Sequence, residues 1–245
     1  ADGKTYKVGI VQFVDDASLN QIEAAIEAEL DAKAAELGVT FDYTLYNGQA
    51  DGTTLNQIGA ELVSKGVDLI VPIATPAVKI MQSATEDTEI PIVFSAVSDP
   101  VGAGIVDSLD APGGRITGTS DALNTKGLLD LMLAQNPDTK TVGLLYSNSE
   151  ANSTTPIAEA KAYLDAKGIA YVEKTGNTND EIMTAASSMV GQVDAVFTPT
   201  DNVVMAAAAA VSETLTKGGI PFYTGADSFA LNGAFVGYGV DYVQL

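Results

Sequence analysis

The two halves of the chain carry similar segments in the same order, and this repeat constrains the fold more than any other feature. KVGI at residues 7–10 resembles TVGL at 141–144, VDLI at 67–70 resembles VDAV at 193–196, and IPIV at 90–93 resembles IPFY at 220–223. The partners of each pair lie roughly 130 residues apart. Buried strands of parallel sheets resemble one another in any case, so chance similarity is the alternative reading. The conserved order favours two similar α/β lobes.

Within each half, apolar runs alternate with segments of helical periodicity. Residues 6–13 (YKVGIVQF) are typical of a buried parallel strand, and residues 18–37 place apolar side chains at helical spacing before Gly38, a predicted C-cap. The same alternation predicts strands at 40–45, 68–74 and 92–95 and helices at 53–65 and 76–84. The predicted fold class is therefore α/β, with two doubly wound parallel-sheet lobes joined by a hinge.

Glycine-rich segments mark the predicted crossings between the lobes. Residues 112–120 (PGGRITGTS) combine glycines with a short β-like core, and residues 237–241 (GYGVD) repeat that combination near the end. We therefore expect lobe 1 at residues 1–118, lobe 2 at 119–237 and a return to lobe 1 at 238–245. Two crossings would allow a hinge to bend while each lobe stays rigid.

Composition excludes several classes of function. The chain has 32 Asp and Glu against 12 Lys and Arg, a net charge of -20, so binding to nucleic acid or to an anionic membrane surface is not expected. There is no cysteine and no histidine, which removes thiol nucleophiles, histidine bases and the usual zinc ligand sets. We expect a soluble monomer without metal or cofactor. The polar N-terminus reads as a start from which any signal peptide has gone.

Candidate binding residues follow the predicted strands, because ligands of open parallel sheets lie beyond the carboxyl ends of the strands. The loops at these positions are rich in Ser, Thr, Asp and Asn, with aromatic residues nearby. Helix capping alone would also explain any single one of these residues. The candidates of the first lobe are Phe13, Asp15, Thr75, Pro76, Ser95, Ala96, Val97 and Asp99. Ser120, Asp121 and Tyr238 are candidates at the two predicted crossings. Those of the second lobe are Ser147, Ser149, Asn152, Thr200, Asp201, Asn202 and Asp227.

Such a set of groups suits a small zwitterion with an apolar side chain. A ligand carboxylate would lie at a helix start, near Thr75 and the backbone of residues 95–97, because free N–H groups and the helix dipole favour anions there. A ligand ammonium needs a carboxylate. Asp227, after a late strand of the second lobe, is the first candidate, followed by Asp201 and Asp121.

Several longer segments resemble the ABC-transporter substrate-binding protein family that includes tryptophan-binding lipoproteins. The resemblance covers essentially the whole chain, and its most specific segments are FSAVSDPVGAGIV (94–106) and PTDN (199–202). It implies a type I periplasmic-binding-protein fold and an amino acid ligand, aromatic in the better-understood members: tryptophan or phenylalanine. It also assigns the carboxylate to Thr75 and residues 95–97 and the ammonium to Asp227.

The resemblance also implies a partner and a location. The partner is an ABC permease in the membrane, and the location is extracytoplasmic, either lipid-anchored at the cell surface or periplasmic. Family members continue with a helix and a last strand, so the C-terminal remainder of lobe 1 is expected to be absent. The chain departs from the family pattern at Asp15-Asp16 and at Gly225-Ala226-Asp227, which leaves the identity of the ligand open.

Other functions remain as alternatives. A receptor of the same fold could bind a sugar or a nucleoside, although sugar sites usually stack the ring on tryptophan and this chain has none. An enzyme could use cleft carboxylates such as Asp15-Asp16 for acid–base chemistry, but no nucleophile motif or phosphate loop is present. A sensor of the same fold would usually carry a DNA-binding or membrane module, which this sequence lacks. We therefore expect a binding protein and not an enzyme.

Overall fold

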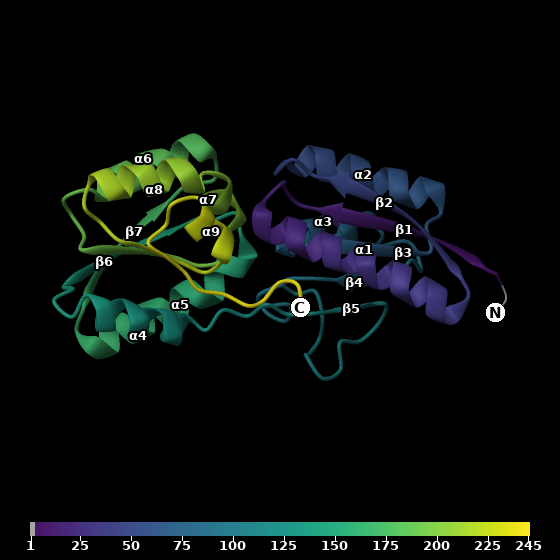
Figure 1. The fold of residues 1–245 in the computed structure, drawn as a ribbon, viewed down its shortest axis with the longest axis horizontal. Helices are drawn as coiled ribbons and strands as arrows, with labels where there is room; N and C mark the ends of the chain where they lie inside the picture. Colours follow the sequence, from purple (N-terminus) through teal and green to yellow (C-terminus); the bar gives the residue numbers. More distant parts are fainter. Residues whose placement is uncertain (1–2) are drawn as a thin grey trace. The chain divides into compact units, whose positions relative to one another are not determined.

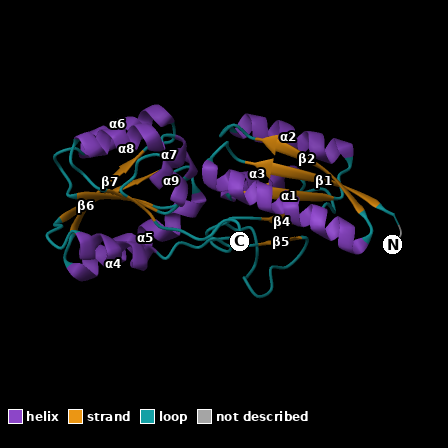
Figure 2. Cartoon of the chain, in the orientation of Figure 1, coloured by secondary structure: helices purple, strands orange, loops and turns teal. Residues whose placement is uncertain are grey.

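A computed structural model describes residues 3–245, and within it the chain forms two compact units. Unit 1 extends to Asp121 and resumes at Asp241, and unit 2 comprises Ala122–Val240. The boundaries expected from the sequence were at residues 118/119 and 237/238. Each unit is an α/β sandwich in which helices cover both faces of a sheet (Figures 1 and 2).

Unit 1 contains a five-stranded parallel sheet with strand order β2-β1-β3-β4-β5. Helix α1 lies on one face, and α2 and α3 pack against each other on the other. The predicted strands and helices of this half are confirmed, including the left-handed Gly38 that ends α1 with φ of 67°. The elements are β1 (Thr5–Gln12), α1 (Ala17–Leu37), β2 (Thr40–Asn47), α2 (Gly52–Lys65), β3 (Leu69–Ile73), α3 (Thr75–Ala84), β4 (Ile92–Phe94) and β5 (Ile116–Gly118).

Unit 2 contains a second five-stranded parallel sheet, with strand order β7-β6-β8-β9-β10. Helices α4 and α5 bury their apolar side chains against one face, around Leu144, Phe197 and Tyr223. The elements are α4 (Thr125–Gln135), β6 (Thr141–Tyr146), α5 (Ala151–Lys167), β7 (Ala170–Thr175), α6 (Asn179–Met189), β8 (Ala195–Thr198), α7 (Asn202–Ala206), α8 (Ala208–Lys217), β9 (Phe222–Thr224), α9 (Asp227–Leu231) and β10 (Val236–Gly237).

The two sheets have the same topology, strand for strand, which confirms the predicted fold class. The resemblance of the first segments has a packing reason. A Cβ on Gly9 of β1 would lie 2.5 Å from the Leu62 side chain of α2, and one on Gly143 of β6 would lie 2.8 Å from the sulfur of Met189 in α6. In each unit, glycine lets the helix approach the central strand closely.

The second pair of similar segments also occupies equivalent positions. Asp68 precedes β3 and accepts a hydrogen bond from the Lys7 N–H at 2.8 Å. Asp194 precedes β8 and accepts bonds from the N–H groups of Lys140 and Thr141 at 2.8 and 2.9 Å. Each carboxylate therefore joins the start of one strand to its neighbour.

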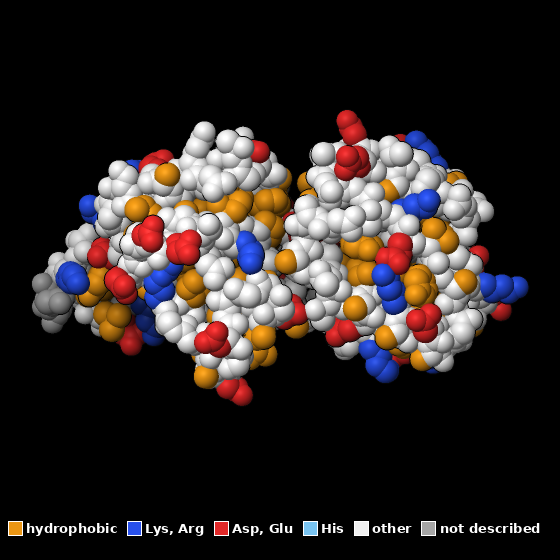
Figure 3. Space-filling model, turned by 180° about the vertical axis from the view of Figure 1, so that it is seen from behind, with side chains coloured by type: hydrophobic (Ala, Val, Ile, Leu, Met, Phe, Trp, Pro, Cys, Tyr) orange, Lys and Arg blue, Asp and Glu red, His pale blue; other side chains and the backbone are white. Residues whose placement is uncertain are grey.

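On the face seen in Figure 3, acidic side chains are scattered over both units. Among residues 3–245, no helix combines the length and the apolar character needed to cross a bilayer. The same residues contain no group of His, Cys, Asp and Glu side chains arranged to hold a metal ion.

Candidate ligand-binding site

The start of α3 in unit 1 has an unusual backbone. Ala74, directly after β3, has φ of 76° and ψ of 146°, a conformation that residues with a Cβ rarely adopt. No side chain caps the first turn of α3, and Pro76 supplies no N–H there. The N–H groups that open the helix are therefore available to an anion, which the helix dipole also favours. Thr75 is buried at this point and Pro76 is half-buried.

The loop after β4 lies beside this turn. The Ala74 N–H donates to the Ser95 carbonyl at 3.1 Å, so the ends of β3 and β4 are in direct contact. Ala96 also has a positive φ, 57°. The Ser95 and Thr119 hydroxyls lie 3.4 Å apart, and the Val97 N–H donates to the Thr119 carbonyl at 3.4 Å. The structure thus brings together Thr75 and residues 95–97, to which the sequence analysis assigned a ligand carboxylate.

Asp121 lies nearby, but its side chain points into unit 1. It is 4 % exposed and accepts hydrogen bonds from the hydroxyls of Ser98 at 3.0 Å and Tyr242 at 3.3 Å. Burial raises the pKa of Asp121, although both hydroxyls oppose the shift. Ser120 donates to the Ser98 carbonyl at 3.3 Å, and Asp99 accepts from the Gly102 N–H at 2.8 Å. Asp121 therefore joins the loop after β4 to both segments that connect the two units.

The loop after β1 carries the other two candidates of unit 1. Phe13 is buried, and its carbonyl accepts from the Ala50 N–H at 2.9 Å. Asp15 is exposed and accepts from the Asn20 amide at 2.8 Å. Asp16 acts as the N-cap of α1, so capping explains one of these two adjacent carboxylates.

In unit 2, the loop after β6 is held by hydroxyl and amide groups. The Ser147 and Ser149 hydroxyls lie 2.7 Å apart, and Asn177 from the loop after β7 accepts from the Ser147 hydroxyl at 2.9 Å. Ser147 is buried, whereas Ser149 is exposed. Asn177 was not among the sequence candidates, and its position after a strand was the signal that could have found it.

Three other candidates of unit 2 point inward. Asn152, Asp201 and Asn202 are each at most 3 % exposed. The Asn152 amide donates to the Thr200 carbonyl at 2.8 Å, and the Ser147 N–H donates to Asp201 at 2.8 Å. These residues therefore join the loop after β6 to the loop after β8. Glu150 lies at the centre of this cluster and was also missed from the sequence.

Thr200 and Asp227 lie at the ends of β8 and β9. The Thr200 hydroxyl donates to the Gly225 carbonyl at 3.0 Å, which places these loops side by side. Asp227 is exposed and opens the first turn of α9. Of the two carboxylates proposed from the sequence for this unit, Asp227 is therefore the one at the surface, since Asp201 is buried.

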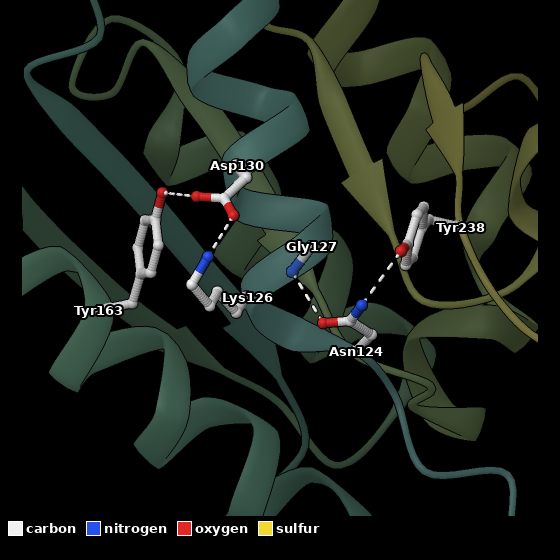
Figure 4. Close-up of polar contacts among 6 residues, drawn as sticks. All are labelled: Asn124, Lys126, Gly127, Asp130, Tyr163 and Tyr238. Carbon is white, nitrogen blue, oxygen red and sulfur yellow. Dashed lines mark hydrogen bonds and ion pairs between the residues drawn. The ribbon is translucent and has the colours of Figure 1, made fainter.

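Tyr238, the last candidate, directs its hydroxyl to the start of α4 (Figure 4). The Asn124 amide donates to this hydroxyl at 3.3 Å, while the Asn124 oxygen caps α4 by accepting from the Gly127 N–H at 2.9 Å. One turn further along, Asp130 accepts from the Tyr163 hydroxyl at 2.6 Å (Figure 4). Within unit 2, Tyr238 thus joins the first and last segments of the unit, next to both crossings.

Unit 1 also contains an apolar groove of about 580 Å³ on the α1 face of the sheet. Leu69, Val71 and Val93 line it from the strands, and Tyr242 lines it from the C-terminal segment. Of the sequence candidates, only Ser95 borders this groove. The groove is therefore distinct from the cluster of polar loops.

The comparison with known families covers nearly the whole chain. The family described as ABC transporter substrate binding protein matches residues 7–245. The chain belongs to this family. Its members are the non-enzymatic, extracytoplasmic components that bind the substrate of an ABC transporter and work with its permease.

Individual relatives are also similar over most of their length. The tyrosine-binding protein of Clostridioides difficile (strain R20291) is 35% identical over 245 residues, which are 100% of this chain and 70% of that protein. The ABC domain from Streptococcus pneumonia in complex with L-Trp has a TM-score of 0.90 and 32% identity, covering 98% of this chain and 80% of the other. The ligand-free, open form of a substrate-binding protein with adhesive properties from Clostridium difficile has a TM-score of 0.67 and 33% identity, with the same coverage.

Proposed function

We propose that this chain binds an aromatic L-amino acid, tyrosine, tryptophan or phenylalanine, and delivers it to an ABC permease. Membership of the substrate-binding family supports the transport role. The names of two relatives, a tyrosine-binding protein and a domain in complex with L-Trp, support the ligand class. The protein would act outside the cytoplasm as a monomer, lipid-anchored or periplasmic, without a cofactor and without catalysing a reaction.

The observation that carries the ligand chemistry is the backbone at the start of α3. An uncapped helix N-terminus lies beside two alanines, Ala74 and Ala96, whose φ angles are positive. Strained residues are retained where their geometry serves a function, and free N–H groups at a helix start bind carboxylates. In the proposal, the α-carboxylate of the ligand occupies this position and contacts Thr75 and residues 95–97.

The ammonium group of the ligand is assigned to Asp227 of unit 2. An exposed carboxylate after a strand can pair with an ammonium without the full cost of desolvation. The proposal includes hinge closure, in which the ligand binds one unit first and its energy favours the closed state. The crossings at residues 121/122 and 240/241 are the places where the chain would bend.

The first experiment identifies the ligand. Mass spectrometry of the small molecule released on denaturation is followed by calorimetric titration with L-tyrosine, L-tryptophan and L-phenylalanine. Saturable binding of at least one of them is expected. If the released molecule is a sugar or a nucleoside, the transport role stands and the ligand class is wrong. If none of the three amino acids binds, the amino acid proposal fails.

The second experiment tests the ammonium assignment. Asp227→Asn should weaken binding of the amino acid by about 1.5–3 kcal/mol, because a hydrogen bond to a charged group is lost. Asp165→Asn, an exposed acid of α5, is the matched control and should leave the affinity unchanged. Equal affinities for the Asp227 variant and the control would remove Asp227 from the site.

A further inference from the structure

Two carboxyl groups lie buried at the same edge of the unit 2 sheet. Glu150 follows β6 and is 3 % exposed, and Asp201 follows β8 and is 0 % exposed. Within residues 3–245, neither carboxyl forms an ion pair with a lysine or an arginine. Asp201 is the charged group that acts on Glu150, since the other neighbours from α5 and α7 are the amides Asn152 and Asn202. Two negative charges in this position would be costly.

The hydrogen bonds show which of the two carries the negative charge. Asp201 Oδ1 accepts from the N–H groups of Val203 and Val204 at 3.1 and 2.9 Å. Asp201 Oδ2 accepts from the Ser147 N–H at 2.8 Å and from the Ser153 hydroxyl at 2.6 Å. Both oxygens thus receive two donors, the arrangement that stabilises a carboxylate anion.

Glu150 is different, because all its donors converge on one oxygen. Oε2 accepts from the Asn152 amide at 2.7 Å, from the Asn202 amide at 2.8 Å and from the Asn202 N–H at 3.0 Å. Among the described residues, no donor reaches Oε1. A carboxylic acid has this asymmetry: one oxygen accepts and the other carries the proton. Burial, followed by repulsion from Asp201, raises the pKa of Glu150 to about 8.

Asn152 offers the matching acceptor. Its Nδ2 donates both to Glu150 Oε2 at 2.7 Å and to the Thr200 carbonyl at 2.8 Å, so the orientation of the amide is fixed. Its Oδ1 is buried and has no partner among the described residues. A proton on Glu150 Oε1 would supply the missing donor and complete a two-point pair between acid and amide.

We propose that Glu150 is a positioning residue for ligand binding: it holds a proton on Oε1, donates it in a hydrogen bond to Asn152 Oδ1, and so fixes the β6–α5 loop against the β8–α7 loop. The contacts of Asn202 with Oε2 and of Asn152 with the Thr200 carbonyl join the same two loops. These loops carry Ser147, Ser149 and Thr200, which are predicted ligand contacts. The inference therefore rests on the proposed function.

Ionisation of Glu150 would break this arrangement. The donor to Asn152 Oδ1 is lost, and a second negative charge appears beside Asp201. Because the pKa of Glu150 is raised above its ordinary value of 4.5, its contribution to stability is complete below about pH 4.5 and is lost as the pH rises toward 8. Ligand affinity depends only on the folded protein, so it should stay constant up to about pH 7 and fall above about pH 8.

The proton is tested first without ligand. Infrared spectroscopy at about pH 7 should show the carbonyl band of protonated carboxylic acids, and Glu150→Gln should weaken that band by the contribution of one carboxyl group. Glu150→Gln should melt at a higher temperature than the wild type at about pH 8 and at a similar temperature at about pH 5. Glu159→Gln removes an exposed carboxylate from α5, the helix that follows Glu150, and serves as the control. A band of equal strength in Glu150→Gln and in the wild type, or a melting difference that does not change with pH, overturns the assignment of the proton.

The positioning role is tested by titration with L-tyrosine and L-tryptophan at about pH 7 and about pH 9. Between these two pH values, the affinity of the wild type should fall roughly tenfold more than the affinity of Glu150→Gln. Ionisation of the ligand itself affects both proteins equally, so it does not contribute to this difference. Glu150→Ala should bind more weakly than the wild type at both pH values. Glu150→Gln should bind as tightly as the wild type at the lower pH. Parallel pH profiles overturn the positioning role. If the wild type binds none of L-tyrosine, L-tryptophan and L-phenylalanine, the proposed function fails, and the infrared and melting results still decide where the proton lies.

Discussion

The two units share one strand order but build the loops at the carboxyl edges of their sheets by different means. In the described part of the chain, the four non-glycine residues with positive φ are Gln49, Ala50, Ala74 and Ala96, all in unit 1. The corresponding loops of unit 2 have ordinary backbone conformations and are held by Glu150, Asp201 and their amide partners. Unit 1 thus uses strained backbone at these loops, whereas unit 2 uses buried side chains.

In the proposed function, this difference would serve the two ends of a zwitterion. Backbone N–H groups at the start of α3 are donors that suit a carboxylate. The loops of unit 2 present acceptors and an exposed carboxylate, Asp227, which suit an ammonium group. Duplicated topology therefore does not imply duplicated chemistry, because the same loop position can be shaped by strain in one unit and by side chains in the other.

The largest expected effect is on the stability of unit 2. Asp201→Ala removes the acceptor for three backbone N–H groups and one hydroxyl, and it also removes the N-cap of α7. We expect a loss of about 3 kcal/mol in the free energy of unfolding. Urea denaturation monitored by circular dichroism measures it.

Asp121→Ala in unit 1 is the matched comparison. Asp121 is equally buried but accepts from two side-chain hydroxyls, which can turn toward other acceptors. A smaller loss of about 1–2 kcal/mol is expected. If the two variants were equally destabilised, the contrast between side-chain support in unit 2 and backbone strain in unit 1 would not hold.

The next effect concerns the strained alanine of unit 1. Ala74→Gly should stabilise the protein by about 0.5–1 kcal/mol, because glycine adopts this conformation without strain, and Ala74→Val should destabilise it by about 2 kcal/mol. Ala226 also directly precedes a helix, but its φ of -150° is ordinary. Ala226→Gly should therefore destabilise by about 0.5–1 kcal/mol. Thermal unfolding of the three variants gives the signs, and a destabilising Ala74→Gly would contradict the assigned strain.

The sequence predicted the fold well because the fold depends on patterns that repeat. Apolar runs, helical spacing and the glycines at positions 9 and 143 each follow from packing that one strand order imposes on both units. The polar loops were also found, because the topology places them at one edge of each sheet. The positions of the two crossings differ from the expected ones by a few residues, since loop composition marks a region and not a residue.

The direction of each side chain could not be predicted in the same way. Nothing in the type of residue 74 or 96 indicates a positive φ, because alanine is not selected for it. Asp121 and Asp201 were candidates for binding the ammonium group of the ligand, yet each side chain is buried among hydrogen-bond donors of its own unit. Only the tertiary structure determines that burial. Glu150 was not among the sequence candidates, and its side chain makes no capping bond to α5 but turns inward to Asn152 and Asn202.

The smallest expected effect concerns the strand starts that the two units share. Asp194 accepts two backbone N–H bonds where Asp68 accepts one. Hydrogen bonds from Lys140 and Thr141 lower the pKa of Asp194, which is largely exposed. A lowered pKa means that the stabilisation is present above the unfolded value of 3.8 and is lost as the pH falls through the folded value. Because solvent screens the exposed carboxylate, the effect is small.

Asp194→Asn should therefore cost about 0.5–1 kcal/mol at about pH 7, and the difference from the wild type should shrink toward about pH 3. Asp68→Asn should cost less at neutral pH, since one N–H bond is affected and not two. Urea denaturation at both pH values measures the four differences. Equal costs for the two variants would mean that the number of donors at a strand start does not set its stability. The difference between the units would then be confined to the carboxyl edges of their sheets.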